Sequence, residues 1–501
     1  MKVKIRKPNI QVLLHKVVTR TSATGSAQVN ATQSQSSLAG PPSQSDSAKN
    51  IYDLTTWLGE GSVVRVQKSV RASAGAFSIS FVDQVMNGLK DTLYALIEPM
   101  DMIEIRFAGD SYKYSGATGQ KLPVMMRGFV ADIQRDQSMG ADGKPRRTIH
   151  VTGHDYHKIL QIIQIFNMPA TPDVANLISS FPLFSKYGPE LNVQTTTAFV
   201  QAVFDLIVNP YIAGMQQAGA TSGTALAEVA TDIQVPDALV SVQLGAFNNG
   251  TVQQLLEQYL DLGPFNEFFI EDRDAGVWGP AGPYAVYRPT PFLDAAQRLT
   301  LQPIQSSVTS GIDPSSDFAP TANCVSIGVN SIISISARRS DAGVANYFWV
   351  DAPRFTMNYD DLTKMFATYA SQQGGATETN AGNGTPAGDA RWANQNAFLT
   401  WIDNRRNLLT TLNQDNVVLE SGAMHLEGHE KIRAGTYVQI NYGDQIQSLH
   451  YAHSVVHTYE PFGNYFTEVD YERGTNFIDR ITAAQSSGSP YFSEMLTPGS
   501  Q

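Results

Sequence analysis

The stretch RAGTYVQINYGDQ, from Arg433 to Gln445, decides the fold that this sequence predicts. It has the pattern of a turn, an alternating strand and a second turn. Much earlier, the chain carries a similar stretch, PMDMIEIRFAGD, from Pro99 to Asp110. The same kind of β element is therefore written twice in one chain, at widely separated positions.

The strands that follow the two stretches also match in order. RGFVADIQRD and RTIHVTGHDY follow the first stretch, and HYAHSVVHTYE and YFTEVDYERG follow the second. The shared features are a first strand that ends at Gly-Asp and a second strand with apolar residues three apart: Gly109-Asp110 and Gly443-Asp444, then Val130 with Ile133 and Ala452 with Val455. This pattern indicates an internal duplication of one small β-barrel, and two unrelated β domains that imitate each other remain the alternative.

A duplicated barrel has a consequence for assembly. Two similar barrels give one subunit a pseudo-twofold internal relation. Three copies of such a subunit would present six similar barrels in a ring, which suits an adaptor between a sixfold and a threefold partner.

The composition narrows the function classes. The 501 residues suffice for about three or four domains. Only 16% of them are charged, against a usual share of about 25%, so the surface is rich in uncharged polar groups that suit large protein contacts. The net charge of -11 argues against a general nucleic-acid binder, and no apolar run approaches the roughly 20 residues of a membrane span. The single cysteine, Cys324, excludes a disulfide framework and favours folding in a cytoplasm.

The predicted fold is α+β and mainly β, with two similar small β-barrels, a mixed α/β middle domain and a helical insert. The expected boundaries are 1–50 for a flexible N-terminal arm, 51–165 for the first barrel with a helix, 166–310 for the middle domain, 311–345 and 416–482 for the second barrel, 346–415 for the insert with its Gly/Ala-rich linker, and 483–501 for a C-terminal tail. Residues 21–50 are mostly small and polar, and they bury too little apolar surface to offset the entropy of ordering them. The basic residues of 1–20 fit contact with DNA or an acidic partner, and a solvated first strand explains them equally well.

Several local elements follow from caps and alternation. DYHKILQIIQIF reads as a helix capped by Asp155, and TTTAFVQAVFDLIVNPYI as a helix ended by Asn-Pro. GTVQQLLEQYLDLG reads as a helix between a Thr251 cap and a Gly263 stop. NEFFIEDRDAGVWGPAGPYAVYRPTPF reads as a hairpin, and Cys324, Ser326 and Gly328 form the small face of a later strand.

No residue is assigned a catalytic, cofactor-binding or metal role, and no cofactor is expected. Eight histidines cluster in the sequence: His150, His154, His157, His425, His429, His450, His453 and His457. Along a strand, His453 and His457 would lie roughly 13 Å apart, too far for one zinc ion, although three copies of one histidine could still meet on a threefold axis. EDRD, from Glu271 to Asp274, could supply paired carboxylates for glycoside cleavage, but a solvated hairpin turn is the simpler interpretation.

The C-terminal block resembles a known family. GHEKIRAGTYVQINYGD, LHYAHSVVHTYEPFGNYFTEVDYERG and the spacing between them are similar to the second barrel of baseplate hub proteins of contractile-tailed bacteriophages, the tail hub or late control protein D-like family. The matching positions are Ile432, Gly435, Val438, Val455, His457, Tyr459, Thr467, Arg473 and Gly474. The first barrel resembles theirs too, with Met100 in place of the usual glycine.

The resemblance implies a non-enzymatic structural protein. It implies a homotrimer in the tail baseplate of a virion, assembled in the bacterial host cytoplasm. Its expected partners are the hexameric tail tube protein, the trimeric spike protein and other baseplate proteins, with room for contact with the tape measure protein, with DNA only in transit, and without membrane insertion. Because some tail hubs carry a cell-wall hydrolase, a tail-associated peptidoglycan hydrolase is the alternative.

Overall fold

The computed structural model describes the parts of the chain that form its sheets and helices. These are residues 7–15, 20–21, 28–29, 51–83, 93–110, 121–139, 143, 145–166, 193–219, 226–235, 239–241, 249–260, 262–263, 265–274, 281–292, 324–340, 409, 412–413, 419–442, 447–461 and 463–475. The predicted C-terminal tail, most of the predicted insert and the Gly443-Asp444 pair lie outside them. The domain boundaries as a whole stay a prediction.

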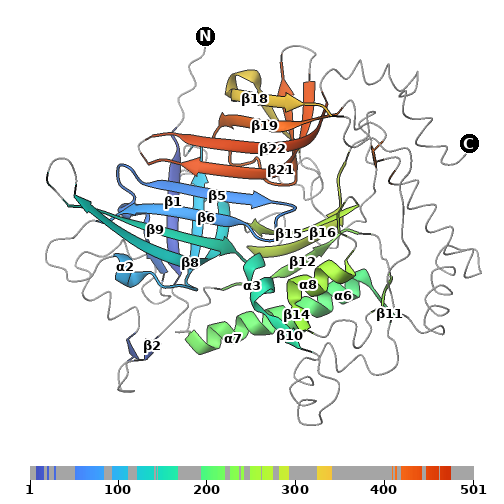
Figure 1. Cartoon of the computed structure of the whole chain (residues 1–501), viewed down its shortest axis with the longest axis horizontal. Helices are drawn as coiled ribbons and strands as arrows, with labels where there is room; N and C mark the ends of the chain where they lie inside the picture. The colour runs from blue at the N-terminus through green and yellow to red at the C-terminus, as the bar shows by residue number, and fades with distance from the viewer. Residues whose placement is uncertain are drawn as a thin grey trace, which may run out of the picture.

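A 13-stranded sheet dominates the molecule (Figure 1). Its strands are β1 (Asn9–His15), β4 (Ile51–Asp53), β5 (Val63–Ser69), β6 (Ala76–Val82), β7 (Met102–Ala108), β8 (Val124–Met139), β9 (Pro145–Asp155), β17 (Cys324–Gly328), β18 (Ile332–Arg338), β19 (Glu420–Glu427), β20 (Thr436–Asn441), β21 (Gln447–Tyr459) and β22 (Tyr465–Thr475). The main path runs β18-β19-β22-β21-β5-β6-β9-β8-β7-β1-β4, and β20 joins β17 to β21. The predicted mainly β, α+β fold class is confirmed.

The sheet contains the same strand order twice. We call β1 and β5–β9 the first module, and β17–β22 the second module. The first module is ordered β5-β6-β9-β8-β7-β1, and the second β18-β19-β22-β21-β20-β17. Each strand has a counterpart in the same position along the chain and across the sheet. The modules differ in one pairing: β1 pairs with β7 antiparallel, whereas β17 pairs with β20 parallel.

The turn that leads into β7 is built again before β20. The amide of Met100 donates to the carbonyl of Val130 at 2.8 Å, and the amide of Gly435 donates to the carbonyl of Ala452 at 2.7 Å. Met100 has a φ of 73° and Gly435 a φ of 87°, so both take the left-handed conformation that favours glycine. Met100 therefore adopts the conformation of its glycine counterpart.

A side-chain oxygen closes each of these turns. Asp101 accepts from the amide of Glu98 at 2.9 Å, and Thr436 accepts from the amide of Arg433 at 3.4 Å. These side chains stabilise the turn locally, as Asp and Thr commonly do. The match at the level of single hydrogen bonds favours duplication over chance imitation.

The following hairpins share a β-bulge. The pairing of β8 with β9 shifts between Val130 and Asp132, and that of β21 with β22 shifts between Ala452 and Ser454. The two bulges fix the correspondence, since Asp132–Gln137 then match Ser454–Tyr459 one for one.

The modules exchange a large and a small residue at one paired position. In the first module Phe77 pairs with Gly153, and a Cβ on Gly153 would lie 2.4 Å from the Phe77 ring. In the second module Gly422 pairs with Tyr471, where a Cβ would lie 3.0 Å from the tyrosine hydroxyl. Gly153 leaves room for the Phe77 ring, whereas a Cβ at Gly422 would meet the Ser336 carbonyl before the Tyr471 hydroxyl. The glycine and the aromatic residue lie on opposite strands of the pair in the two modules.

Each module encloses an apolar core: the first receives buried side chains from all six of its strands, and the second from β17 and β19–β22, with β18 contributing only the partly buried Ile332. The first core draws on Val12, Val66, Phe77, Ile79, Ile105, Met126 and Val151, among others, and the second on Val325, Met424, Val438, Val455 and Val469. Val325 and Ile327 point inward while Cys324, Ser326 and Gly328 are exposed, which confirms the predicted alternation of that strand.

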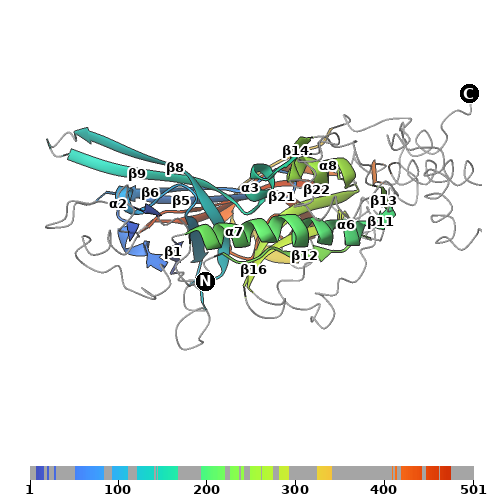
Figure 2. The ribbon, with the colours of Figure 1, turned by 90° about the horizontal axis from the view of Figure 1, so that it is seen from below.

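The two modules are joined edge to edge within the chain. β21 pairs antiparallel with β5, from Ser454 opposite Ser69 to Tyr459 opposite Val64. Figure 1 shows β21 and β22 beside β5 and β6 in one surface. Figure 2 shows the sheet as a flat body from which the β8–β9 hairpin extends.

The prediction that residues 1–50 form a flexible N-terminal arm is wrong for part of this range. β1, Asn9–His15, lies between β7 and β4, and Ile10, Val12 and Leu14 enter the first core. The alternation of NIQVLLH accounts for this, because its apolar side chains complete the inner face of the first module.

The middle part packs helix α8 and the helical segment α6–α7 against a three-stranded sheet, whose order is β12-β16-β15. Its strands are β12 (Ala230–Ile233), β15 (Asn266–Arg273) and β16 (Gly282–Pro289), of which the last two form the predicted hairpin. α8 (Val252–Tyr259) has the predicted cap at Thr251, which forms a capping box with Gln254, and it ends at Tyr259, before the predicted stop at Gly263. α3 (His157–Ile162) is shorter than predicted, and Asp155 accepts from the amide of His157 at 3.1 Å.

The helix predicted to end at Asn209-Pro210 continues through it. α6 (Thr196–Val203) runs into a π-helical turn, η4 (Phe204–Val208), and then into α7 (Asn209–Gly219). Proline lacks an amide hydrogen and its ring clashes with the carbonyl four residues earlier in a regular α-helix. The wider π turn directly before it accommodates the proline, so the prediction of a helix end is wrong.

The remaining described elements are short. α2 (Leu93–Leu96) is a single helical turn. Three pairs of short strands are antiparallel: β10 (Gln164–Phe166) with β14 (Asn249–Thr251), β11 (Val193–Thr195) with β13 (Leu239–Ser241), and β2 (Arg20–Thr21) with β3 (Gln28–Val29). The short helices η2 (Thr55–Trp57) and η5 (Val329–Ser331) connect strands that are consecutive in the chain, β4 to β5 and β17 to β18.

Candidate functional site

The stretch EDRD, expected to be a solvated turn, is the centre of a buried ionic cluster. Glu271, Asp272 and Arg273 belong to strand β15, and Asp272 and Arg273 are 2% and 5% exposed. They are buried because both modules of the large sheet pack against the hairpin β15–β16. We call the ion pairs around this hairpin the ionic joint.

Asp272 ties the hairpin to the first module through Lys68. The ammonium of Lys68 lies 2.6 Å from Asp272 and 3.4 Å from Asp155, and it also donates to the carbonyl of Ile270 at 3.2 Å. Burial by itself lowers the pKa of Lys68, but the two carboxylates raise it overall, so the ammonium stays charged.

A second part of the joint surrounds Glu104 on β7. Its carboxylate accepts from Arg106 and from Arg127, the latter at 2.8 Å. Arg106 also reaches Asp274 at 3.0 Å. Burial favours the neutral carboxyl, yet Arg106 and Arg127 outweigh it and hold the pKa of Glu104 at about 2. The group is therefore a carboxylate at all ordinary pH values.

Arg433 connects the second module to both other parts. Its guanidinium donates to the carbonyl of Asp272 at 3.0 Å and to the carbonyl of Val124 at 2.7 Å. Arg433 is a residue of the repeated turn, so the turn that positions β20 also carries this link. The planar fork of arginine suits two carbonyls from different strands.

Arg288 on β16 makes the second link between the hairpin and the second module. It pairs with Glu267 at 2.8 Å and donates to the carbonyl of Gly435 at 2.8 Å. The hydroxyl of Tyr451 donates to Glu267 at 2.7 Å. Burial and the neighbouring Glu267 raise the pKa of Tyr451 well above its usual value, so the hydroxyl keeps its proton.

Within the middle part, Arg273 holds β12 to β15. It lies 2.8 Å from Asp232 and 3.0 Å from Glu271, and its guanidinium sits 4.3 Å from the centre of the Tyr284 ring. The charges of Lys68, Glu104, Arg273 and Arg288 thus each have partners of opposite sign, whereas Arg433 donates to backbone carbonyls; such partners are the condition under which buried charges are tolerated.

The histidines do not gather in one place. His457 is buried, with the hydroxyl of Tyr465 at 2.9 Å and the carbonyl of Ile432 at 3.0 Å, and burial lowers its pKa to about 3. His450 is also buried, its pKa lowered to about 4, and lies 2.9 Å from the hydroxyl of Ser448. Among the residues that the structure describes, no group of three or more His, Cys, Asp or Glu side chains is placed to hold a metal ion.

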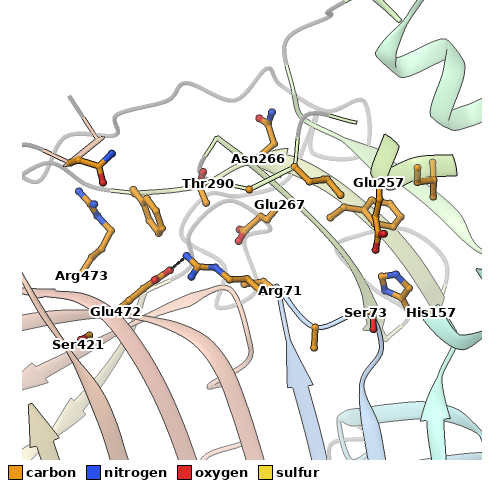
Figure 3. Close-up of a pocket in the computed structure, with 18 of the residues that line it drawn as sticks. Arg71, Ser73, His157, Glu257, Asn266, Glu267, Thr290, Ser421, Glu472 and Arg473 are labelled. Atoms are coloured by element: carbon orange, nitrogen blue, oxygen red, sulfur yellow. Dashed lines mark hydrogen bonds and ion pairs between the residues drawn. The ribbon is translucent and has the colours of Figure 1, made fainter. Parts of the chain in front are cut away.

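A cavity of about 630 Å³ opens beside the joint (Figure 3). Its wall comes from the turn after β5, helix α8, the ends of the hairpin and the end of β22. Figure 3 shows Arg71 of the first module paired with Glu472 of the second across it. His157, Glu257 and Glu267 also line it. The cavity lies where the parts of the chain meet, and its charged groups belong in part to the contacts that join them.

The sequence did not reveal the ionic joint. Its charged residues stand at alternating positions of strands, which normally indicates a solvent-facing side. Two signals could have pointed to it: the density of charges in strands of an otherwise weakly charged chain, and an arginine inside the repeated turn.

Comparison with known proteins gives structural neighbours only. No protein-family model and no curated protein matches this chain. A tail protein from Neisseria meningitidis MC58 matches with a TM-score of 0.36 and 10% identity, over 82% of this chain and 91% of that one. The 43 kDa tail protein of prophage MuSo2 from Shewanella oneidensis matches with a TM-score of 0.38 and 11% identity, over 92% and 97%.

A third neighbour is the E. coli c3393 protein, described as a component of the type VI secretion system with structural similarity to the T4 bacteriophage tail proteins gp27 and gp5. It matches with a TM-score of 0.36 and 8% identity, over 84% of this chain and 75% of that one. Scores this low do not establish a common fold. A separate observation is that none of the described helices has the length and apolar composition to cross a membrane.

Proposed function

We propose that this chain is a structural hub of a phage-type tail baseplate. Three copies form a ring of six similar modules, which joins a hexameric tail tube to a trimeric spike and lines the channel for DNA. The expected homotrimer, the tube, spike and other baseplate partners, and the contractile setting all belong to this proposal, as does a role without catalysis.

The observation that carries the proposal is the repetition of one module within the chain. Both modules have the same strand order, a turn residue in the left-handed conformation at the same position, Met100 or Gly435, and a β-bulge at the same position. A subunit with two equivalent modules can meet a sixfold partner with three copies. The sequence resemblance of the second module to baseplate hubs agrees with this reading.

The ionic joint supports a load-transmitting rather than a catalytic role. It binds the first module, the middle part and the second module through charge-assisted hydrogen bonds, which fix orientation well. Partners that must keep a ring in register need such fixed orientation.

The peptidoglycan hydrolase remains the other candidate. Its best acidic residues were those of EDRD, and each is engaged: Glu271 with Arg273, Asp272 with Lys68 and Asp274 with Arg106. For Glu271, burial raises the pKa, but Arg273 and its other arginine neighbours outweigh burial and lower the pKa overall, so this carboxylate is poorly suited to donate a proton. This favours the structural proposal.

The mass in solution tests the proposal. Light scattering should give about 164 kDa, three times the chain mass of 54.6 kDa. A single-chain mass at every protein and salt concentration would contradict the trimeric ring.

A further inference from the structure

One edge of strand β8 carries no neighbour in the described part of the chain. β7 pairs with β8 only as far as Phe129, and from Asp132 to Gln137 β8 pairs with β9 alone. The counterpart strand β21 is covered along its whole length. β20 pairs with it up to Ala452, and β5 continues on the same edge from Ser454 to Tyr459.

Strand β18 has the complementary open edge. It is the counterpart of β5, and within the described residues it pairs only with β19. Its side chains from Ile333 to Arg338 are all exposed. Ile335 is 40% exposed, whereas its counterpart Val64 in β5 is fully buried. The difference arises at the edge where β5 has β21 beside it and β18 has no described strand.

We propose that β18 of one copy pairs antiparallel with residues Asp132–Gln137 of β8 in the next copy. This inference rests on the trimer proposed above. The contact repeats between subunits the junction that β5 and β21 make within the chain. Each module would then be linked to both of its neighbours by the same strand pairing.

The internal junction also sets the register. Inside the chain Val66 lies opposite His457 and Arg65 opposite Thr458. Val66 pairs with Phe77 as Ala337 pairs with Gly422, so Val66 and Ala337 correspond. Carried over, Ala337 lies opposite Arg135 of the next copy, and Ser336 lies opposite Asp136.

Charges on the two edges are complementary in this register. Arg338 would lie opposite Gln134, with Asp132 and Asp136 at the two diagonal positions. Diagonal neighbours on one face of a sheet are within reach of long side chains. Exposed Asp136 contacts Gln134 at 2.9 Å and His150 at 3.5 Å through its side chain, and neither contact occupies the backbone edge of β8 that has no partner among the described strands.

The interface is head to tail, since a β8 edge meets a β18 edge. Head-to-tail contacts close into a ring when the rotation allows, and otherwise make filaments. The flat body with the β8–β9 hairpin extending from it (Figure 2) allows one copy to reach the next without rearranging its core.

Engineered disulfides test the register directly. Residues directly opposite in an antiparallel pair have Cα atoms about 4.5–5.5 Å apart, within the range that a disulfide bridges. In a Cys324→Ser background, the double variant Asp136→Cys with Ser336→Cys is oxidised and run on a denaturing gel. The control combines Gln134→Cys with Ser334→Cys, which the register sets four residues apart, roughly 13 Å.

The expected result is covalent dimers and trimers for the matched pair and single chains for the control. Mixing the two single variants should give dimers only. Light scattering of the reduced proteins runs in parallel. A threefold mass without links in the matched pair overturns this pairing and leaves the trimer proposal standing, whereas a single-chain mass without links overturns both. Equal linking of the control pair overturns the register.

Discussion

Replacing Glu104 with glutamine removes the charge at the centre of the ionic joint while keeping the size of the side chain. Glu104 accepts from Arg106 and Arg127, and all three side chains are buried. Its pKa falls from 4.5 to about 2 on folding. At about 1.4 kcal/mol for each pKa unit, the folded state stabilises the carboxylate by on the order of 3 kcal/mol.

The sign of the pH dependence follows from the lowered pKa. The contribution of Glu104 is complete above pH 4.5 and is lost as the pH falls toward 2. At pH 7, Glu104→Gln should therefore lower the free energy of unfolding by about 3 kcal/mol. At pH 3 the loss should shrink to about 1 kcal/mol, because the unfolded glutamate is then protonated.

Denaturant unfolding at the two pH values measures this difference. The control is Glu468→Gln, which removes an exposed pair with Arg65 at 3.9 Å and should change the free energy of unfolding by less than about 0.5 kcal/mol. Equal effects of Glu104→Gln at pH 7 and pH 3, or an effect no larger than that of the control, would refute the electrostatic account of the joint.

Five further outcomes are expected. Met100→Gly should be more stable than Met100→Ala by about 0.5–1 kcal/mol in denaturant unfolding, because only glycine relaxes at positive φ; the reverse order would count against the repeated turn. Gly435→Ala should destabilise the protein more strongly, since its Cβ would lie 2.5 Å from the Arg288 guanidinium; an unchanged unfolding midpoint would contradict that contact. Arg433→Gln should cost about 1.5–3 kcal/mol by losing its two bonds to strand carbonyls, again read from unfolding. Purified protein should release no fragments from peptidoglycan, and turnover would count against the hub. Arg338→Glu should shift the mass measured by light scattering toward single chains, and an unchanged mass would count against the subunit contact.

The repeated β element could be read from the sequence because it depends on short-range patterns. Alternation, turn residues and the spacing of Val130 with Ile133 and of Ala452 with Val455 are all local. The structure places both pairs at the same bulge. The Thr251 cap is local in the same way, since it involves Gln254 three residues on.

Features that depend on distant neighbours were missed. The strand NIQVLLH alternates, but only the inner face of the first module explains why it is ordered beside a polar segment. EDRD resembles a solvated turn until two modules cover it. The parallel pairing of β17 with β20 and the π turn before Pro210 likewise have no local signature.

An experimental density map of the purified particle, viewed along its axis, tests the central claim most directly. The account predicts three chains per ring and six superposable modules, with the β5–β21 junction inside each chain alternating with the β8–β18 junction between chains. A ring of six chains, or a threefold particle whose two modules occupy unrelated positions around the axis, would contradict it.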